Sequence, residues 1–283
     1  MLTVRFWGVR GSIASAGGHT AQVGGNTSCV EVQAGGQLFI LDAGTGLRGL
    51  GAELMRRGGP VDAHLLLSHF HWDHIQGFPF FTPGFIPGNK ITVYGPERSA
   101  PRGDVRAALD AQMKPPHFPI GLDVMRAELG FRGLPAGGEL RIGDAHVRAA
   151  AACHPNGCLA YRVSAGGRSV VYATDTEHDA QSGQLDAHLV DLARGADVLI
   201  YDAQYTEAEY AQKRGWGHST NREAARLAHA AGVGQLVLFH HDPSHDDWEV
   251  ARIEAETRAL FPLTSAAREG LEIRLTPGVQ AAA

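Results

Sequence analysis

The chain has 283 residues, 44% of them hydrophobic and 36 of them glycine, a composition typical of a turn-rich α/β protein with a sizeable core. Its net charge of −5, without a clustered run of Lys or Arg, disfavours binding of extended nucleic acid. Because neither a long apolar run nor a signal-peptide pattern occurs, we expect no membrane association and no secretion.

The cysteines indicate the redox environment of the protein, and the absence of a linker indicates the number of domains. Cys29, Cys153 and Cys158 are odd in number and irregularly spaced, which suits reduced thiols better than a disulfide framework. Cys153 is expected to be a small buried residue. Since no Ser/Gly/Pro-rich linker divides the sequence, residues 1–283 are expected to form a single domain. We therefore expect a soluble cytoplasmic protein.

The amino-terminal part of the chain predicts strands joined by glycine-bearing loops. Alternating hydrophobicity predicts a strand at Leu2–Gly8, which a tight loop at residues 10–12 follows. A hairpin is expected over residues 29–41, with a Gly-Gly turn. Residues 42–46 then end its second strand and open an amphipathic helix that extends to about residue 57.

The strongest signal lies directly after the apolar run at residues 64–67. This run is too short for a helix and predicts a buried strand that ends at Ser68. Imidazole nitrogen and carboxylate oxygen are ligands that Zn²⁺, Mn²⁺ and Fe²⁺ accept. Four such groups in one turn would be unfavourable without cations, so the turn predicts a metal site. Its candidate ligands are His69, His71, Asp73 and His74.

Two proline-containing loops follow this turn. Residues 78–88 are aromatic and unsuited to regular structure, and we expect them to border the mouth of the site. After a strand at residues 91–94 and a helix at 104–113, the second loop contains His117 and Phe118, which could stack on a base or ring. Alternatively, this loop packs on its own body or on a second subunit, which would make a homodimer.

In the carboxyl-terminal half, several polar residues again stand at predicted strand ends. The strand pair at residues 139–152 ends beside His154, and the hairpin at residues 159–173 ends beside Asp175. A buried strand at residues 198–201 precedes Asp202, and another at Gln235–Phe239 precedes two histidines.

Helices and an edge strand complete the chain. Residues 220–223 fit a capping box for a helix at Asn221–Ala231, so His218 lies just outside a helix amino terminus. The free N–H groups at such a terminus suit a phosphate. An amphipathic surface helix at residues 246–260 and an edge strand at residues 271–275 follow.

The pattern His-x-His-x-Asp-His at residues 69–74 resembles the signature of the metallo-β-lactamase-fold hydrolases without a mismatch. The resemblance implies an α/β fold, a four-layer αββα sandwich, with metal ions at the sheet edges. It implies two divalent ions, with Zn²⁺ the leading candidate and Mn²⁺ or Fe²⁺ as alternatives. It also implies that Asn26 and Asp42 lie near the metal loop, although Asp42 could equally be a helix N-cap.

The same resemblance implies a ligand set for each ion. His240 is the leading candidate for the last ligand of metal two, and His241 is the alternative. The implied ligands are His69, His71 and His154 for metal one, Asp73, His74 and His240 for metal two, and Asp175 as the bridge.

Residues 199–243 are similar to the carboxyl-terminal half of ribonuclease Z and its cyclic-nucleotide phosphodiesterase relatives. Those proteins have Gly-His-Ser-Thr before a helix and then a strand of the form Leu-Val-Leu-x-His, as here. The resemblance implies that His218 stabilises the phosphoryl transition state or protonates the leaving oxygen, and that Asp202 orients it. Asp202 is shorter than the glutamate of ribonuclease Z.

Two features of these relatives are missing. Many ribonuclease Z proteins carry a long RNA-binding arm between the third histidine and the bridging aspartate, but here only a hairpin fits between His154 and Asp175. The three-cysteine zinc motif of the carbon–phosphorus-lyase phosphodiesterase is also absent. The small phosphodiesterases are therefore the best match.

We expect a binuclear metal-dependent phosphodiesterase that hydrolyses a small phosphodiester, with a 3′,5′-cyclic nucleotide as the leading substrate. Asp73 or Asp175 would accept the proton of the attacking water. The alternatives are a carboxyl-ester or lactone hydrolase on the same metals, ribonuclease Z-like RNA processing, and a non-catalytic sensor that binds a nucleotide.

Overall fold

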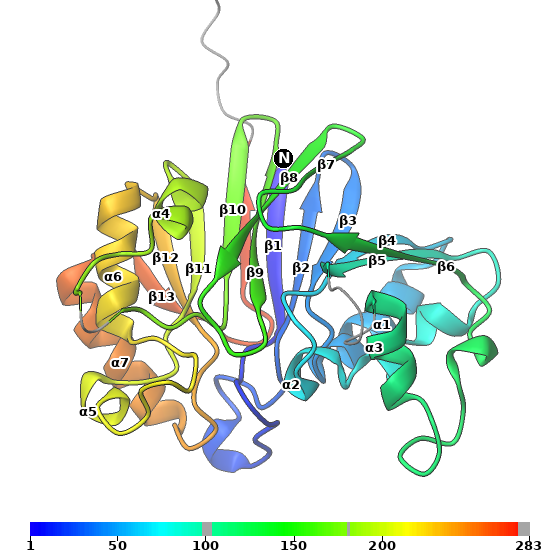
Figure 1. Ribbon diagram of the computed structural model, residues 1–283, viewed down its shortest axis with the longest axis horizontal. Helices are drawn as coiled ribbons and strands as arrows, with labels where there is room; N and C mark the ends of the chain where they lie inside the picture. The colour runs from blue at the N-terminus through cyan, green and yellow to red at the C-terminus, as the bar shows by residue number, and fades with distance from the viewer. Residues whose placement is uncertain (98–103, 180–181, 277–283) are drawn as a thin grey trace, which may run out of the picture.

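The computed structural model describes residues 1–97, 104–179 and 182–276. Within these residues, two seven-stranded sheets stand between two groups of helices (Figure 1). The predicted αββα sandwich is therefore confirmed. The first sheet is covered by α1 (Gly46–Arg57) and α3 (Val105–Gln112), and the second by α4 (Ala187–Ala193), α6 (Asn221–Ala231) and α7 (Asp247–Leu260).

The two sheets repeat one pattern of pairing. The first has the order β14-β1-β2-β3-β4-β5-β6 and the second the order β13-β12-β11-β10-β9-β8-β7. In the first sheet β3, β4, β5 and β6 pair in parallel, and in the second sheet β10, β11, β12 and β13 do the same. The remaining pairs in both sheets are antiparallel. The first sheet contains β1 (Leu2–Gly8), β2 (Cys29–Ala34), β3 (Gln37–Leu41), β4 (Asp62–Leu66), β5 (Lys90–Pro96), β6 (Glu128–Leu134) and β14 (Glu272–Leu275). The second contains β7 (Glu139–Ile142), β8 (Ala145–Ala152), β9 (Cys158–Ala165), β10 (Arg168–Ala173), β11 (Val198–Asp202), β12 (Gln235–Phe239) and β13 (Thr264–Ala266).

The core has three layers because the strands alternate their side chains between two apolar environments. In β12, Val237 and Phe239 pack between the two sheets, whereas Leu236 and Leu238 pack under the helices. Burying one such side chain contributes about 1.5–3 kcal/mol. A shift of the strand register by one residue would move the side chains packed between the sheets under the helices, and the reverse. The packing therefore fixes the register, and with it the residue at which each strand ends and its loop begins.

Some elements were not expected from the sequence. The strand β6 contains two glycines, is about half exposed and pairs with β5 at the sheet edge, and it lacks an alternating apolar pattern. The strand β13 and the helices α4 and α5 (Glu207–Tyr210) are short. Residues 78–88 are not wholly irregular, because they form 3₁₀ turns at Phe78–Phe80 and Thr82–Phe85.

Across the described parts of the chain, no helix combines the length and the apolar character that crossing a lipid bilayer requires.

Candidate metal centre

The predicted site residues come together at the carboxyl ends of the central strands. Parallel strands present these ends at one edge of a sheet, and the two sheets present them side by side. Three of the residues have a positive φ, which is uncommon outside glycine and clusters at functional sites: Asp42 (60°), Asp175 (51°) and His240 (61°). The strand ends supply Asp42 from β3, residues 68–74 from β4, Asp175 from β10, Asp202 from β11 and His240 from β12.

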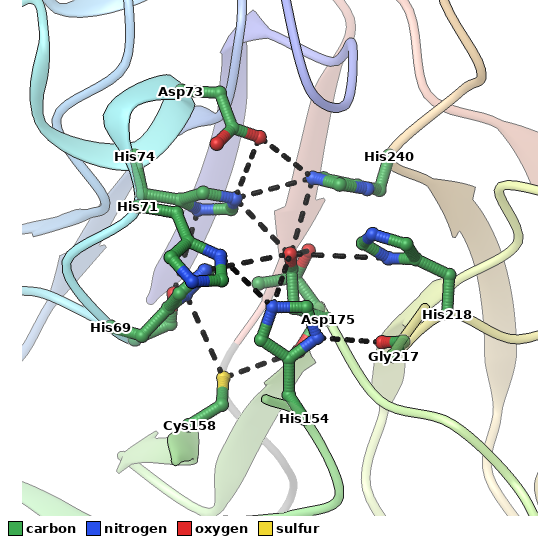
Figure 2. Close-up of polar contacts among 12 residues, drawn as sticks. His69, His71, Asp73, His74, His154, Cys158, Asp175, Gly217, His218 and His240 are labelled. Atoms are coloured by element: carbon green, nitrogen blue, oxygen red, sulfur yellow. Dashed lines mark hydrogen bonds and ion pairs between the residues drawn. The ribbon is translucent and has the colours of Figure 1, made fainter. Parts of the chain in front are cut away.

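The first group of donor atoms consists of His69, His71 and His154, whose donors lie within 4.8 Å of one another (Figure 2). His154 Nε2 faces His71 Nδ1 at 3.1 Å, while His154 Nδ1 donates to the Gly217 carbonyl at 2.7 Å. His69 is buried, and its Nε2 has no hydrogen-bond partner among the described residues. Since an unpaired buried nitrogen is costly, this arrangement fits a bound cation.

The second group consists of Asp73, His74, Asp175 and His240, all of them buried. His74 Nε2 and His240 Nε2 approach to 3.2 Å, and Asp73 Oδ2 lies 3.1 Å from the first and 3.3 Å from the second. The opposite nitrogen of each ring is anchored, His74 Nδ1 to Asp42 at 2.7 Å and His240 Nδ1 to Gln204 at 2.8 Å. Such anchoring fixes the tautomer that directs Nε2 toward a metal.

Asp175 lies between the two groups (Figure 2). Its Oδ1 is 3.2 Å from both His74 Nε2 and His240 Nε2. Its Oδ2 is 3.7 Å from His69 Nε2 and 3.6 Å from His154 Nε2. The two oxygens of one carboxylate thus face separate sets of nitrogen donors.

The charges of this buried cluster favour bound cations. Burial alone would lower the pKa of His74, but Asp175, Asp73 and Asp42 outweigh it and raise that pKa well above its usual value. Burial would raise the pKa of Asp175, but His240, His74 and His69 hold it well below its usual range. Ionised carboxylates with imidazole nitrogens in a buried site form a donor set that fits divalent metal ions.

His218 and Asp202 lie beside the second group. His218 Nδ1 donates to Asp202 Oδ2 at 2.9 Å, and its ring stacks on His240 with centroids 4.9 Å apart. Burial would lower the pKa of His218, but the Asp202 carboxylate outweighs it and raises that pKa to about 9. Their donor atoms, with those of Asp175 and His240, form a third set within 4.8 Å.

The loop before α6 differs from the predicted capping box in one respect. The Thr220 side chain accepts from the Glu223 N–H at 3.2 Å, as predicted. The Glu223 side chain, however, accepts from Arg226 at 2.6 Å, because Arg226 lies one turn away on the same helix. His218 still precedes the amino terminus of this helix.

Asp42 orients the metal loop and is not a helix N-cap. The cap position of α1 is Thr45. The Asp42 carboxylate accepts from Ser68 N at 2.7 Å, Ser68 Oγ at 2.8 Å, Tyr172 OH at 2.7 Å and His74 Nδ1 at 2.7 Å. Its position at the end of β3, with φ 60°, turns the side chain toward the neighbouring strand β4.

We expect the substitution Asp42→Asn to weaken metal binding by roughly 10–100-fold, the usual effect of removing a partner that orients a metal ligand. Competition with a chromogenic chelator measures the change. Asp186→Asn is the matched control, because Asp186 caps α4 and asparagine caps a helix as well as aspartate does. Equal metal affinity of the Asp42 variant and the control would show that Asp42 does not support the site.

The structure distinguishes between two adjacent histidines. His240 lies in the cluster, whereas His241 Nε2 donates to the Ala267 carbonyl at 3.0 Å. Burial and the nearby Arg10 lower the pKa of His241 to about 3, so it remains neutral.

Asn26, expected near the metal loop, donates through its side chain to Glu269 at 3.0 Å. Its carbonyl accepts from the Arg10 N–H, so it supports the loop at residues 10–12.

Two supporting residues were missed by the sequence analysis. Glu177 accepts from the N–H groups of Gly215 and Gly217, each at 2.7 Å, and so holds the loop that carries His218. Gly217 has φ +88°, and a Cβ there would lie 2.3 Å from His154 Nδ1, so this position requires glycine. Gln204 anchors His240. No local pattern indicates the roles of Glu177 and Gln204, although each lies two positions after an aspartate at a strand end.

The amino-terminal loop also contacts the cluster. The Ser12 N–H donates to Asp73 Oδ2 at 2.8 Å. A Cβ at Gly11 would lie 2.4 Å from His240 Nδ1, so only glycine permits this approach.

Cys153 is exposed, which corrects the expectation that it is buried. The strand β8 ends at Ala152, so Cys153 lies in the loop beyond the strand and not within the sheet. Cys29, Cys153 and Cys158 are all free thiols, as predicted.

Residues 38–241 match the family model described as the Beta-lactamase superfamily domain. The chain belongs to this superfamily. With its αββα fold and its cluster of histidine and aspartate donors, it is a metal-dependent hydrolase of the metallo-β-lactamase fold.

Among its relatives, the chain is 28% identical over 278 residues to ribonuclease BN of Citrobacter koseri, an alignment that covers 82% of this chain and 87% of that protein. Its fold is similar to that of the metallo-β-lactamase fold protein YhfI from Bacillus subtilis, with a TM-score of 0.71, 20% identity and coverage of 96% and 98%. A diphosphatase from the PhnP family is also similar, with a TM-score of 0.68, 16% identity and coverage of 99% and 100%.

Proposed function

We propose that the protein is a binuclear metal-dependent phosphodiesterase that hydrolyses a small phosphodiester, with a 3′,5′-cyclic nucleotide as the leading substrate. One observation carries the proposal: the two oxygens of Asp175 face two separate sets of donors. Similarity to a ribonuclease BN supports phosphodiester chemistry.

In this proposal each donor group holds one ion, and Asp175 is the ligand that both share. When bound, two divalent ions polarise the phosphoryl oxygens and activate the water nucleophile. The protein's own residues hold the ions, orient the substrate and transfer protons. His69, His71 and His154 hold one ion, and Asp73, His74 and His240 hold the other.

His218 is proposed to act on the phosphate as an acid. Asp202 holds Nδ1, which leaves Nε2 as the nitrogen that can protonate the leaving oxygen or stabilise charge on the phosphoryl group. The pKa of about 9 that Asp202 confers keeps the imidazole charged at neutral pH. Bound cations would lower this pKa, because like charges disfavour the imidazolium, and bring it nearer the range best suited to an acid catalyst.

Asp73 is the proposed acceptor for the proton of the attacking water, with Asp175 as the alternative. Ser12 N and the rings of His74 and His240 hold Asp73 Oδ2 in its orientation. The helix α6 begins three residues after His218, and the positive end of its dipole favours an anion nearby.

The hairpin between the two sites supports a small substrate. Between His154 and Asp175 the chain forms only β9, a Gly-Gly turn and β10, which leaves no place there for the arm expected of a ribonuclease Z. The net charge of −5 provides no general attraction to RNA.

Ribonuclease Z-like RNA processing is the second candidate, because 82% of the chain aligns with a ribonuclease BN. The lactone hydrolase and the nucleotide sensor have no specific observation in their favour. A lactone hydrolase has no need of the His218–Asp202 pair, and a sensor would not need a complete donor set.

To test the proposal, the purified, metal-loaded protein is assayed for hydrolysis of four kinds of substrate. These are cyclic nucleotides, bis(p-nitrophenyl) phosphate, a lactone panel and a tRNA precursor. We expect turnover of the first two. Binding of a small phosphodiester should depend weakly on salt because few phosphate contacts form, whereas RNA affinity would fall steeply. Cleavage of the tRNA precursor without turnover of any cyclic nucleotide would contradict the proposal.

A further inference from the structure

A cavity of about 640 Å³ lies directly beside the metal loop. The short helix α2 (Trp72–Ile75) and the residues around it divide their side chains between two sites. Asp73 and His74 belong to the metal cluster, whereas Phe70, Trp72 and Ile75 line the cavity. The helices α2 and α3, both labelled in Figure 1, are joined by the hydrogen bond that Gln112 Nε2 donates to the Ile75 carbonyl.

The cavity walls are aromatic and partly exposed to solvent. Trp72 is 72% exposed and Phe80 is 55% exposed, and such large apolar side chains at the edge of a cavity usually mark a binding surface. Phe80 meets Phe118 edge to face, with centroids 5.6 Å apart. Phe118 packs on the body of the protein, which is one of the two sequence-based alternatives, and it also lines this cavity.

The remaining wall residues indicate what the cavity binds. Ala108 and Ala111 of α3 also line the cavity, and their small side chains leave space within it. Gln76 and Gln112 add amides, and the Gln112 Nε2 donates to the Ile75 carbonyl at 3.0 Å, which orients its oxygen. Glutamine amides pair with the polar edges of bases. No Asp, Glu, Lys or Arg is among the described residues that line the cavity, and the titratable side chain among them is His117.

We propose that this cavity binds the nucleobase of the substrate whose phosphate lies at the metal cluster. The inference rests on the proposed phosphodiesterase function and makes the substrate a nucleotide. Aromatic faces stack on a base and the glutamine amides bond to its edge. The helix α2 connects the two sites, because the cavity residues Trp72 and Ile75 flank the cluster residues Asp73 and His74.

The first test measures binding without hydrolysis. Adenosine, which has no phosphate, is added to the protein while tryptophan fluorescence is recorded. We expect saturable quenching that Trp72→Phe removes. Trp248→Phe is the matched control, because Trp248 is 71% exposed on α7 and does not line the cavity, so this variant should retain the quenching. Equal quenching in both variants would overturn the proposal.

The second test compares a 3′,5′-cyclic nucleotide with the 1-methoxy ribose 3′,5′-cyclic phosphate, which lacks the base. For Trp72→Ala and Phe80→Ala, the KM for the nucleotide should rise roughly 5–150-fold relative to the KM for the baseless compound, the usual effect of losing one base–aromatic stack. Trp248→Ala should retain the wild-type ratio.

The outcomes separate the two proposals. An unchanged ratio in the cavity variants would overturn the base site. A loss of self-association in sedimentation, with the ratio unchanged, would in addition make this face a subunit interface. Specific quenching by adenosine without hydrolysis of any phosphodiester would support the cavity as a base site and overturn the proposed function.

Discussion

Replacing Asp175 with alanine is expected to lower metal content and abolish hydrolysis of bis(p-nitrophenyl) phosphate. Its two oxygens lie 3.2–3.7 Å from four histidine nitrogens, so the change removes the carboxylate that faces both donor sets. The loss of metal affinity should exceed the 10–100-fold that follows when only a supporting residue is removed. Metal analysis per chain and initial rates measure the two effects.

The matched control for this prediction is Asp144→Ala, which removes an exposed carboxylate from the turn between β7 and β8. It should keep wild-type metal content and rate. An Asp175→Ala protein with two ions per chain and full activity would show that Asp175 is not the shared ligand.

Replacing His218 with alanine is expected to lower kcat by roughly 10²–10⁴-fold while two metal ions remain bound. That range is the usual contribution of a positioned acid. Asp202→Asn should keep the imidazole and an acceptor for Nδ1 but remove the charge that raises the pKa of His218, so its loss of rate should be smaller. Metal content and single-turnover rates, measured on the same variants, distinguish an acid that acts on the substrate from a metal ligand.

The alternative outcomes for His218 are equally definite. Its donor atoms lie close to Asp175 and His240, so a loss of metal together with activity would make it a ligand and require the role of His240 to be reassigned. If neither metal content nor rate changes, the loop before α6 only caps the helix.

The local part of the site could be predicted from the sequence because its physical cause is local. The buried strand before Ser68 and the donors directly after it lie in one short stretch, so the turn could be recognised without knowledge of the fold. His154, Asp175 and His240 are distant in the sequence. Only the family resemblance connected them, and the order of strands in the two sheets explains why they meet.

The supporting residues could not be predicted because their partners depend on tertiary packing. Glu177 contacts a loop that begins far along the chain, at Gly215, and Gln204 contacts His240 across neighbouring strands. The two interpretations of Asp42 could not be separated by sequence, since an aspartate after a strand and before a helix fits both. The edge strand β6 was missed because a half-exposed strand lacks a strong apolar pattern.

The most direct test of the central claim is a metal titration of the protein after chelator treatment, with bound ions and hydrolysis of bis(p-nitrophenyl) phosphate measured in the same samples. A site built from two donor groups around one shared carboxylate predicts no hydrolysis without metal, and full activity only when two ions are bound per chain. Full activity with no bound metal, or saturation of both binding and rate at a single ion per chain, would contradict it.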